Sequence, residues 1–309
     1  MKIMTTGIKN NIKQVNSFID EAFDEKLTPT YHLAISIGVD HIWLAVNEKS
    51  LIESFSPSLT TTIEQPKAKY IAFENFSLSN ILDLDQLADS LDLFYKESLL
   101  FNHRYGSVAC IIVNNSSTIV PSPLFDFSKK ALYLGFNIFL QSDKNIEVDD
   151  LKNLEAKNIF ALPSNLKNKL EELQTNIRFH HFSSLLIEGL LIQNKNQPNK
   201  KLFVHVQPSH FEVLVFEGKG LLFYNTFNYF TAEDFLYYLL FVCEQMNLNP
   251  ENIELIVLGE LEKNSDIFTL TQKYIRNIKF GERADESHLS YQLQTLPKHF
   301  YFTLFNNYS

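Results

Sequence analysis

Two stretches of this 309-residue chain repeat the same order of apolar and polar residues. The first is HLAISIGVDHIWLAVNEKSLIESF, from His32 to Phe55, and the second is KLFVHVQPSHFEVLVFEGKGLLFYNTFNYF, from Lys201 to Phe230. Aligned, they place similar residues at Ile35 and Val204, Ile37 and Val206, His41 and His210, Leu44 and Val213, Val46 and Val215, and Glu48 and Glu217. Apolar residues that alternate between tight turns predict three consecutive strands in each copy. The chain is therefore expected to fold as two related halves.

Each predicted meander is followed by further helices and strands. In the first half we expect a helix over 83–100, a strand over 108–113, a strand over 159–162, a helix through Leu166, Leu170 and Leu173, a strand at IRFHHF (177–182) and a helix at SSLLIEGLLI (183–192). In the second half we expect a helix capped by Thr231 and Asp234, a strand at IELIVLGE (253–260), a helix through Ile267, Leu270 and Tyr274, and a strand at NIKF (277–280). Strand, helix and strand in succession imply parallel pairing in a sheet that helices cover. The expected class is α/β with mixed sheets.

The same patterns predict the domain organisation. Apolar residues at Ile8, Ile12, Val15, Ile19 and Phe23 have helical spacing and predict an N-terminal helix. The stretch near 117–157 breaks the pattern, and we expect an inserted subdomain or a flap there. The run QNKNQPNK has no apolar residue and predicts a linker over 193–200. The expected domains are a first lobe over 1–192, with its N-terminal helix and insertion, and a second lobe over 201–309.

The composition limits which partners and which cellular compartment are expected. The formal net charge is −9 and the pI is about 5.5, which does not favour nucleic acid or anionic lipid as a partner. The N-terminus has no apolar signal-peptide core, and no apolar run approaches the ~20 residues that span a bilayer. We therefore expect a cytoplasmic protein without membrane insertion. Cys110 and Cys243 lie in apolar runs and are expected to be buried free thiols.

The order of a meander followed by helix, strand, helix and strand, present twice with an insertion in the first copy, resembles the actin-like ATPase superfamily. In that superfamily each lobe is a ribonuclease-H-like unit, and nucleotide lies in the cleft between the lobes. More narrowly, the chain is similar to a family of uncharacterised bacterial proteins with a degenerate actin-like fold. Actin-like pilus-assembly and cell-division proteins share this architecture. The resemblance implies duplicated ribonuclease-H-like lobes with mixed sheets.

The superfamily's nucleotide motifs fall on altered residues in this chain. Its first Asp-x-Gly phosphate motif falls on Ser36, Ile37 and Gly38, which keeps the glycine and loses the carboxylate. The second falls on His205, Val206 and Gln207, and its adenosine motif ends at Gly259 and Glu260, where the superfamily has two glycines. Hydrolysis of a magnesium nucleotide requires carboxylates that position the metal and the attacking water. The resemblance therefore implies no catalytic residue, no metal site and no cofactor here.

Three further features allow alternative interpretations. Asp40 is a carboxylate two residues after Gly38, and a turn-forming role is favoured for it over metal binding. His180 and His181 lie on opposite faces of a strand, and structural roles are favoured for them. Ser36 and His205 would face each other across the cleft as nucleophile and base, but no orienting acid accompanies them. The aromatic residues Phe223, Tyr224, Phe227, Tyr229 and Phe230 are expected to fill a core, with the terminal segment HFYFTLFNNY (299–308) or a partner covering the rest.

Two functions remain open at this point. The first is a non-catalytic scaffold for an unknown protein partner, because the topology is kept and the carboxylates are lost. The alternative is a nucleotide- or small-ligand-binding protein with weak or no ATPase activity. Its ligand would contact Gly38, Asp40 and Gly259, with Ser36, His205, Gln207 and Glu260 at the altered positions of the cleft.

Overall fold

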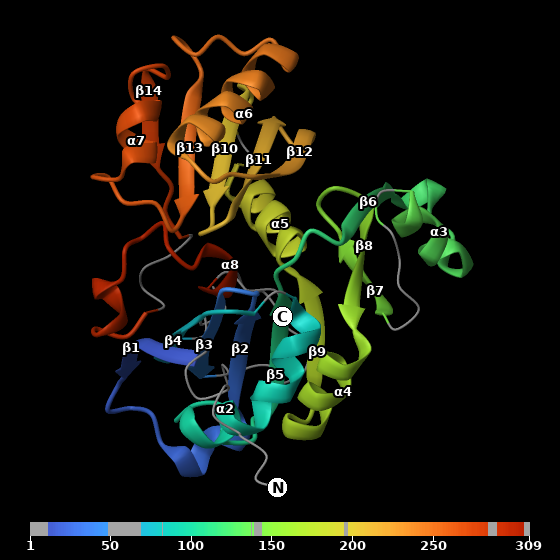
Figure 1. Ribbon diagram of the computed structural model, residues 1–309, viewed down its shortest axis with the longest axis vertical. Coiled ribbons are helices and arrows are strands. Elements are labelled where there is room, and N and C mark those ends of the chain that lie inside the picture. The colour runs from blue at the N-terminus through green and yellow to red at the C-terminus, as the bar shows by residue number, and fades with distance from the viewer. Residues whose placement is uncertain are drawn as a thin grey trace, which may run out of the picture.

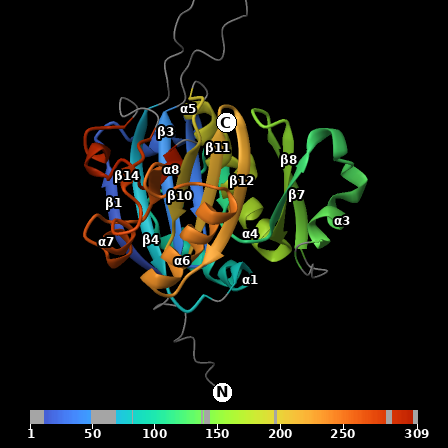
Figure 2. The same cartoon turned by 90° about the horizontal axis from the view of Figure 1, so that it is seen from above.

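The computed structural model describes residues 12–48, 69–81, 83–136, 138, 144–194, 197–283 and 289–305. Two lobes are stacked along the long axis, and each is built on a mixed sheet (Figure 1). A third, smaller sheet lies to one side of both lobes, as the view from above shows (Figure 2). Within the described residues, no helix has both the length and the apolar character that crossing a bilayer requires.

The sheet of the first lobe has six strands in the order β1-β4-β3-β2-β5-β9. Their bounds are β1 Ile12–Ile19, β2 Tyr31–Ile37, β3 His41–Glu48, β4 Tyr70–Leu78, β5 Ser107–Ile112 and β9 Ile177–His181. The strand β2 pairs parallel with β5, which pairs parallel with β9, and the other pairs are antiparallel. An antiparallel meander thus extends into a parallel half, as the strand–helix–strand pattern predicts.

The sheet of the second lobe has five strands in the order β12-β11-β10-β13-β14. Their bounds are β10 Lys201–Val206, β11 His210–Glu217, β12 Gly220–Asn228, β13 Glu254–Gly259 and β14 Asn277–Phe280. Without β1, the first sheet has the same order and directions, so that β2 corresponds to β10 and β5 to β13. The two hairpins also close alike, since Gly38 N–H donates to the His41 carbonyl and Gln207 N–H to that of His210, each at 3.0 Å. The predicted duplication and the α/β class are confirmed.

Helices cover the outer face of each sheet. The helical segments outside the insertion and outside the space between the lobes are η1 Glu25–Thr30, α1 Leu84–Leu87, η3 Ala88–Ser90, α2 Leu91–Glu97, α4 Ser164–Leu173, α6 Ala232–Gln245, α7 Asp266–Thr271 and η7 Leu293–Thr295. In the first lobe, α1, α2 and α4 bury leucines against β2 and β3. In the second lobe, Leu239 of α6 and Phe268 of α7 pack against β10 and β13. Thr231 and Asp234 form the predicted capping box of α6.

Two helices lie between the lobes, and each belongs in sequence to one lobe and packs on the other (Figure 1). The helix α5 (Phe182–Asn194) follows β9 of the first sheet, yet Leu186 and Leu190 pack against Phe203 of the second sheet. The short helix α8 (Phe302–Phe305) follows the second lobe, yet Phe305 packs against Phe73 of the first sheet. The inner face of each sheet is thus covered by chain from the other half.

The insertion forms a three-stranded antiparallel sheet of its own, in the order β6-β8-β7. Its elements are β6 Ser117–Pro121, η4 Ser122–Leu124, η5 Phe127–Lys129, α3 Lys130–Gly135, β7 Lys144–Leu151 and β8 Ala156–Pro163. Leu134 of α3 and Ile159 of β8 form its small core. The strand predicted over 159–162 is therefore part of this sheet and not of the first lobe. The strand that corresponds to β13 is β5.

The predicted N-terminal helix is wrong over 12–23, and Ile8 lies outside the described residues. Ile12–Ile19 is the edge strand β1, antiparallel to β4. A bulge between Gln14 and Asn16 leaves Val15 unpaired and 51% exposed. Because a bulge shifts side-chain alternation by one residue, Ile12 and Ile19 reach the same core face. Their spacing imitates that of a helix.

Three other expectations differ from the structure. The third strand of the first meander was expected at LIESF (51–55), which lies outside the described residues, and the strand in that position of the sheet is β4. The single helix expected over 83–100 is α1, η3 and α2 in succession and ends at Glu97. The terminal residues Phe300–Phe305 pack between the lobes and not over the aromatic residues of β12 and its end, where Phe230, two residues after β12, is 93% exposed. Cys110 and Cys243 are buried free thiols, as predicted.

We expect Phe302→Ala to lower the free energy of unfolding by about 3–5 kcal/mol, because Phe302 is fully buried against α5 and the second sheet. Urea unfolding measures the loss. The control is Tyr291→Ala in the same C-terminal segment, where the side chain is 84% exposed and the change should stay within about 0.5 kcal/mol. Equal effects of the two substitutions would contradict the position of the C-terminal segment between the lobes.

Candidate functional site

The altered motif positions come together where the two lobes meet, at the position of the superfamily's nucleotide cleft. The strands β2, β10 and β13 all end at this cleft, and they bring Ser36, His205 and Gly259 to it. Ser36, His205 and Gln207 are at most 3% exposed. Glu260, after β13, interacts electrostatically with Asp40 and His205, so the cleft holds polar residues of both lobes.

On the first lobe, Ser36, His41 and Asp40 form a hydrogen-bonded chain. The hydroxyl of Ser36 lies 3.2 Å from Nε2 of His41, and Nδ1 of His41 lies 2.7 Å from Oδ1 of Asp40. Burial alone would raise the pKa of Asp40, but the hydrogen bond and charge of His41 outweigh it and hold that pKa below its usual range. The order of atoms is that of a serine–histidine–aspartate triad.

Two observations indicate that the hydrogen bonds between Ser36, His41 and Asp40 have a structural role. Ser36 has no exposed surface, so a substrate has no access to its hydroxyl. The His41 ring is stacked on Trp43 at 3.9 Å between centroids, and Trp43 packs edge-on against Tyr301 of the C-terminal segment. Ser36 has its partner on its own lobe and not in His205, so the nucleophile and base pair that the sequence disfavours is not formed.

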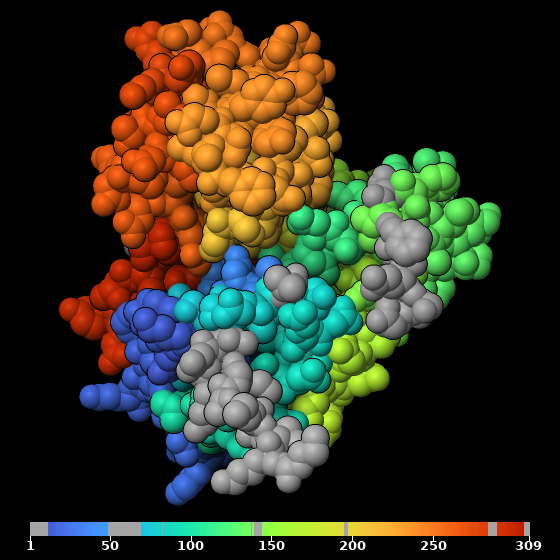
Figure 3. All heavy atoms as spheres, in the orientation of Figure 1, coloured from blue at the N-terminus to red at the C-terminus, as the bar shows by residue number. Residues whose placement is uncertain are grey.

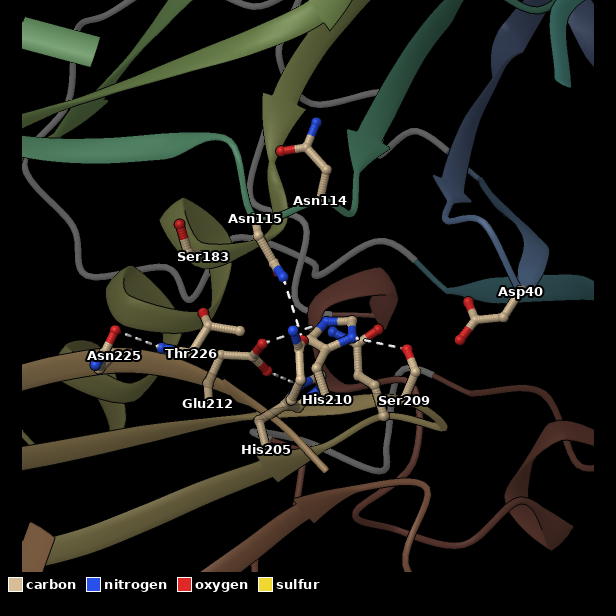
Figure 4. A network of polar contacts seen from close by, with 12 residues as sticks. Asp40, Asn114, Asn115, Ser183, His205, Ser209, His210, Glu212, Asn225 and Thr226 are labelled. Carbon is tan, nitrogen blue, oxygen red and sulfur yellow. Dashed lines mark hydrogen bonds and ion pairs between the residues drawn. The ribbon is translucent and has the colours of Figure 1, made fainter. Parts of the chain in front are cut away.

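On the second lobe, Glu212 is shared by two histidines (Figure 4). Its Oε2 lies 3.0 Å from Nδ1 of His205, and its Oε1 lies 3.4 Å from Nε2 of His210. Glu212 has no exposed surface. The sequence analysis missed this carboxylate. The hairpin register contained the signal, because a turn that pairs Gln207 with His210 also pairs His205 with Glu212.

A third network joins the insertion to the first lobe. Asp149 of β7 lies 2.9 Å from Nδ1 of His180 and accepts hydrogen bonds from the His181 N–H and the Ser184 hydroxyl, at 2.8 and 2.6 Å. His180 and His181 are thus tied into the packing, and the favoured structural roles agree with this. Within the described ranges, no three histidine, cysteine, aspartate or glutamate residues are arranged to hold a metal ion.

The two retained glycines are needed by the protein's own packing. Gly259 has φ +84°, and a Cβ at this position would lie 2.1 Å from the Val206 carbonyl oxygen. Its N–H donates to the His299 carbonyl at 2.8 Å. A Cβ on Gly38 would lie 2.7 Å from the His41 ring. Close approach of the Val206 backbone thus explains Gly259, and close approach of the His41 ring explains Gly38, without a bound phosphate.

The charges at the cleft are negative where the superfamily binds phosphate. Asp40 of the first lobe and Glu260 of the second interact across the cleft, and Asp40 lies on the hairpin that faces the second lobe (Figure 4). Burial raises the pKa of Glu260, His41 and His205 oppose this, and Asp40 adds to it. A polyphosphate placed here would meet two carboxylates, and like charges at short distance repel strongly in a partly buried site.

Gln207 has an unusual environment. Its side chain is 2% exposed, and neither its amide oxygen nor its amide nitrogen has a hydrogen-bond partner. Its main chain is paired, because the N–H donates to His210 and the carbonyl accepts from the Tyr229 hydroxyl at 2.6 Å. Oδ2 of Asp40 is also buried without a partner. Buried polar groups are normally paired, so these atoms are exceptions.

Comparisons with known proteins agree with this architecture. Residues 20–278 match the family described as Protein of unknown function (DUF3822). A solved structure from Bacteroides thetaiotaomicron VPI-5482, described as a protein with actin-like ATPase fold and unknown function, is 23% identical, with a TM-score of 0.69 over 88% of this chain and 97% of that chain. No curated protein matches.

Two more distant structures are also similar. The PilM–PilN type IV pilus biogenesis complex is 11% identical, with a TM-score of 0.52 over 81% of this chain and 88% of that chain. The AlfA filament from a B. subtilis plasmid is 10% identical, with a TM-score of 0.39 over 90% and 97% of the two chains, which is too low to carry an argument. The expected actin-like fold is confirmed.

We expect Gly259→Ala to lower the free energy of unfolding by about 3 kcal/mol or more, because it adds a clash with Val206 to the cost of a positive φ. Gly218→Ala is the matched control, since Gly218 has φ +60° with no atom near its Cβ position, and its cost should be about 1 kcal/mol. Urea unfolding compares the two. Equal losses would show that packing against Val206 is not what requires glycine.

The buried His181 predicts a loss of stability in mild acid. Burial lowers its pKa from 6.5 to about 4, against the attraction of Asp149. The neutral ring fits its partners, since Nε2 lies 3.0 Å from the Asn114 carbonyl and Nδ1 lies 2.7 Å from the Ser183 hydroxyl. Between these two pKa values the unfolded chain binds more protons than the folded one. The free energy of unfolding therefore falls as the pH falls through this window.

The expected loss from this one group between pH 7 and pH 4 is about 3 kcal/mol, at about 1.4 kcal/mol per pKa unit. Urea unfolding at pH 7.5, 6.0, 5.0 and 4.0 measures it. His181→Gln should have a shallower pH dependence than the native chain, whatever its own stability. Parallel curves for the two proteins would show that His181 does not titrate in this window.

Proposed function

This chain belongs to the family described as Protein of unknown function (DUF3822), and we propose that it is a non-catalytic protein with an actin-like fold that acts by binding another protein. The non-catalytic part of this proposal rests on the burial and pairing of the side chains in the cleft. Ser36 and Glu212, in the two lobes, are fully buried in networks formed by the protein's own side chains. A nucleotide would have to break both networks in order to reach the altered motif positions.

The chemistry that remains does not favour phosphoryl transfer. Ser36 and His205 stand where the superfamily has its two aspartates, so the carboxylates that position magnesium and the attacking water are absent from those positions. The carboxylates that are present, Asp40 and Glu260, interact with each other across the cleft and with histidines. They repel the polyphosphate that a catalytic site would hold.

Two observations support a protein-binding role. The solved structure of PilM, which shares the fold, is a complex with PilN. The insertion also carries large apolar side chains in contact with solvent, with Leu124, Phe127, Leu132 and Phe136 between 56% and 78% exposed. Large exposed apolar side chains gathered in one short segment are typical of interaction surfaces. The proposed site of action is therefore the surface around the insertion and not the cleft.

A second candidate function is the binding of a small uncharged ligand in the cleft. It is favoured by Gln207, whose buried amide has a donor and an acceptor without partners. A neutral ligand with both hydrogen-bonding groups would satisfy these atoms without the repulsion that a phosphate meets. Nucleosides without phosphate provide a practical probe of this candidate.

We expect no nucleotide to stabilise the protein. A thermal-shift titration with ATP, ADP and GTP, each with and without magnesium, should move the melting temperature by less than about 1 °C at 1 mM, which corresponds to a Kd of about 1 mM or weaker. Adenosine and guanosine in the same plate test the second candidate. Phosphate release from ATP should equal that of a blank without protein.

The variant Glu260→Gln is the matched control, because it removes one carboxylate and keeps the shape of the side chain. We expect nucleotides to leave the melting temperature of this variant unchanged as well, because packed side chains fill the cleft in addition to the negative charge there. A shift of several degrees with Mg-ATP in the native protein, or phosphate release that Gln207→Ala abolishes, would refute the non-catalytic role.

A further inference from the structure

A groove of about 760 Å³ lies between the second lobe and the insertion. One wall is β12, and the other consists of β6, Leu154 and Ala156. In the space-filling view the orange second lobe and the green insertion are separate masses with a notch between them (Figure 3). Both β12 and β6 are edge strands of their sheets, so two strand edges line the same groove.

The register of the second sheet shows which backbone groups of β12 face the groove. The bond from Gln207 N–H to the His210 carbonyl closes the β10–β11 hairpin. Because antiparallel pairs alternate between bonded and non-bonded, the backbone groups of Glu212 point to β10. Thr226 pairs with Glu212, so its own N–H and C=O point away from β11. The same alternation applies to Tyr224 and Asn228, and all three residues line the groove.

This edge has no strand partner. The sheet order ends at β12, and across the described ranges no backbone hydrogen bond joins β12 to the insertion. The N–H of Thr226 donates instead to the side-chain oxygen of its neighbour Asn225 at 3.0 Å. At one end of the groove, the Asn115 side chain approaches that of Asn228 at 3.5 Å. Ile119 and Leu154 of the insertion and Tyr224 of β12 pack against the same apolar cluster.

The groove is uncharged, which is unusual for a sheet edge in a chain with a net charge of −9. Edge strands are normally protected by charged side chains, by proline or by a covering element. Pro121 protects β6 in this way, whereas β12 has the sequence GLLFYNTFN, with neither charge nor proline. Leu222 on this strand is 43% exposed. An exposed, neutral, nine-residue edge is suited to pair with another strand.

We propose that this groove binds an extended, uncharged segment of another protein, which adds to β12 as the sixth strand of the second sheet. The backbone groups of Tyr224, Thr226 and Asn228 would pair with it, and β6 would contact its side chains. These residues span five positions, so a segment of about 17 Å fits. Main-chain hydrogen bonds supply affinity in this mode, and the neutral walls select against charged side chains. The inference rests on the proposed protein-binding function and gives it a site.

The test uses the full chain and a phage-displayed library of random decapeptides. We expect selection to enrich uncharged peptides in which β-branched or aromatic residues alternate. Their binding, measured by fluorescence anisotropy with synthetic peptides, should weaken at least tenfold on Leu222→Glu, because this change places a charge on the groove wall. Tyr291→Glu is the matched control, since its side chain is exposed outside the groove, and binding should be unchanged.

N-methylated peptides make the test independent of variant folding. Methylation at alternate residues removes the N–H groups along one edge of an extended peptide and keeps its side chains. Of the two possible patterns, one should abolish binding and the other should keep it, because a single edge of the peptide pairs with β12. Equal binding by both patterns would overturn strand addition.

Two other results would also overturn the proposal. One is the enrichment of no peptide, or of peptides whose binding Leu222→Glu leaves unchanged. The other is a native protein that is dimeric by light scattering and becomes monomeric on Leu222→Glu, which would assign the edge to a second copy of this chain. The nucleotide titration separates these failures from failure of the proposed function. If nucleotides leave the melting temperature unchanged and no peptide binds, only the proposal about the groove is refuted. If the protein hydrolyses ATP, the proposed non-catalytic role is refuted.

Discussion

The exchange of α5 and α8 between the lobes is the constraint on which the rest of the structure depends. Each sheet has an apolar inner face that its own half leaves uncovered, and the last helix of the other half covers it. Because an apolar sheet face in water costs about 25 cal/mol per Å² of apolar surface, neither half is expected to be stable alone. The two lobes are therefore held in a fixed relation, and the cleft between them is closed by packing. Phe302 and Trp43 belong to this packing and lie beside the altered motif positions.

This closure determines how polar residues are accommodated in the cleft. Strands that end at a cleft in the actin-like fold bring polar side chains into a region that α5 and α8 exclude from water. Each of these side chains then needs a partner, since an unpaired buried polar group costs about 1–3 kcal/mol. Ser36 finds His41, and His205 finds Glu212, within the same hairpin. Replacement of the superfamily's aspartates by serine and histidine is consistent with this demand, because both can be buried neutral.

Much of the fold could be predicted from sequence, because the signal was repeated. Two meanders with matching hairpins predicted the duplication and the α/β class, and the resemblance to the actin-like superfamily placed Ser36 and His205 at the cleft. The errors have physical causes. The bulge at Val15 gave a strand the spacing of a helix, and the apolar strand over 159–162 carried no mark of the sheet to which it belongs. The pairing of Glu212 with His205 depends on a register between strands, which alternation within one strand does not reveal.

The groove beside β12 shows a further limit of pattern reading. The aromatic residues of β12 were expected to fill a core or to be covered, and the structure separates these roles by face. Phe223 and Phe227 pack towards α6, and Tyr224 packs towards α5. The part of β12 without a partner is neither face but its edge. That edge consists of backbone N–H and C=O groups, which every sequence has. The absence of charged residues from GLLFYNTFN is therefore the sign of such an edge in the sequence. It can be interpreted only with the sheet order, which shows that β12 is an edge strand.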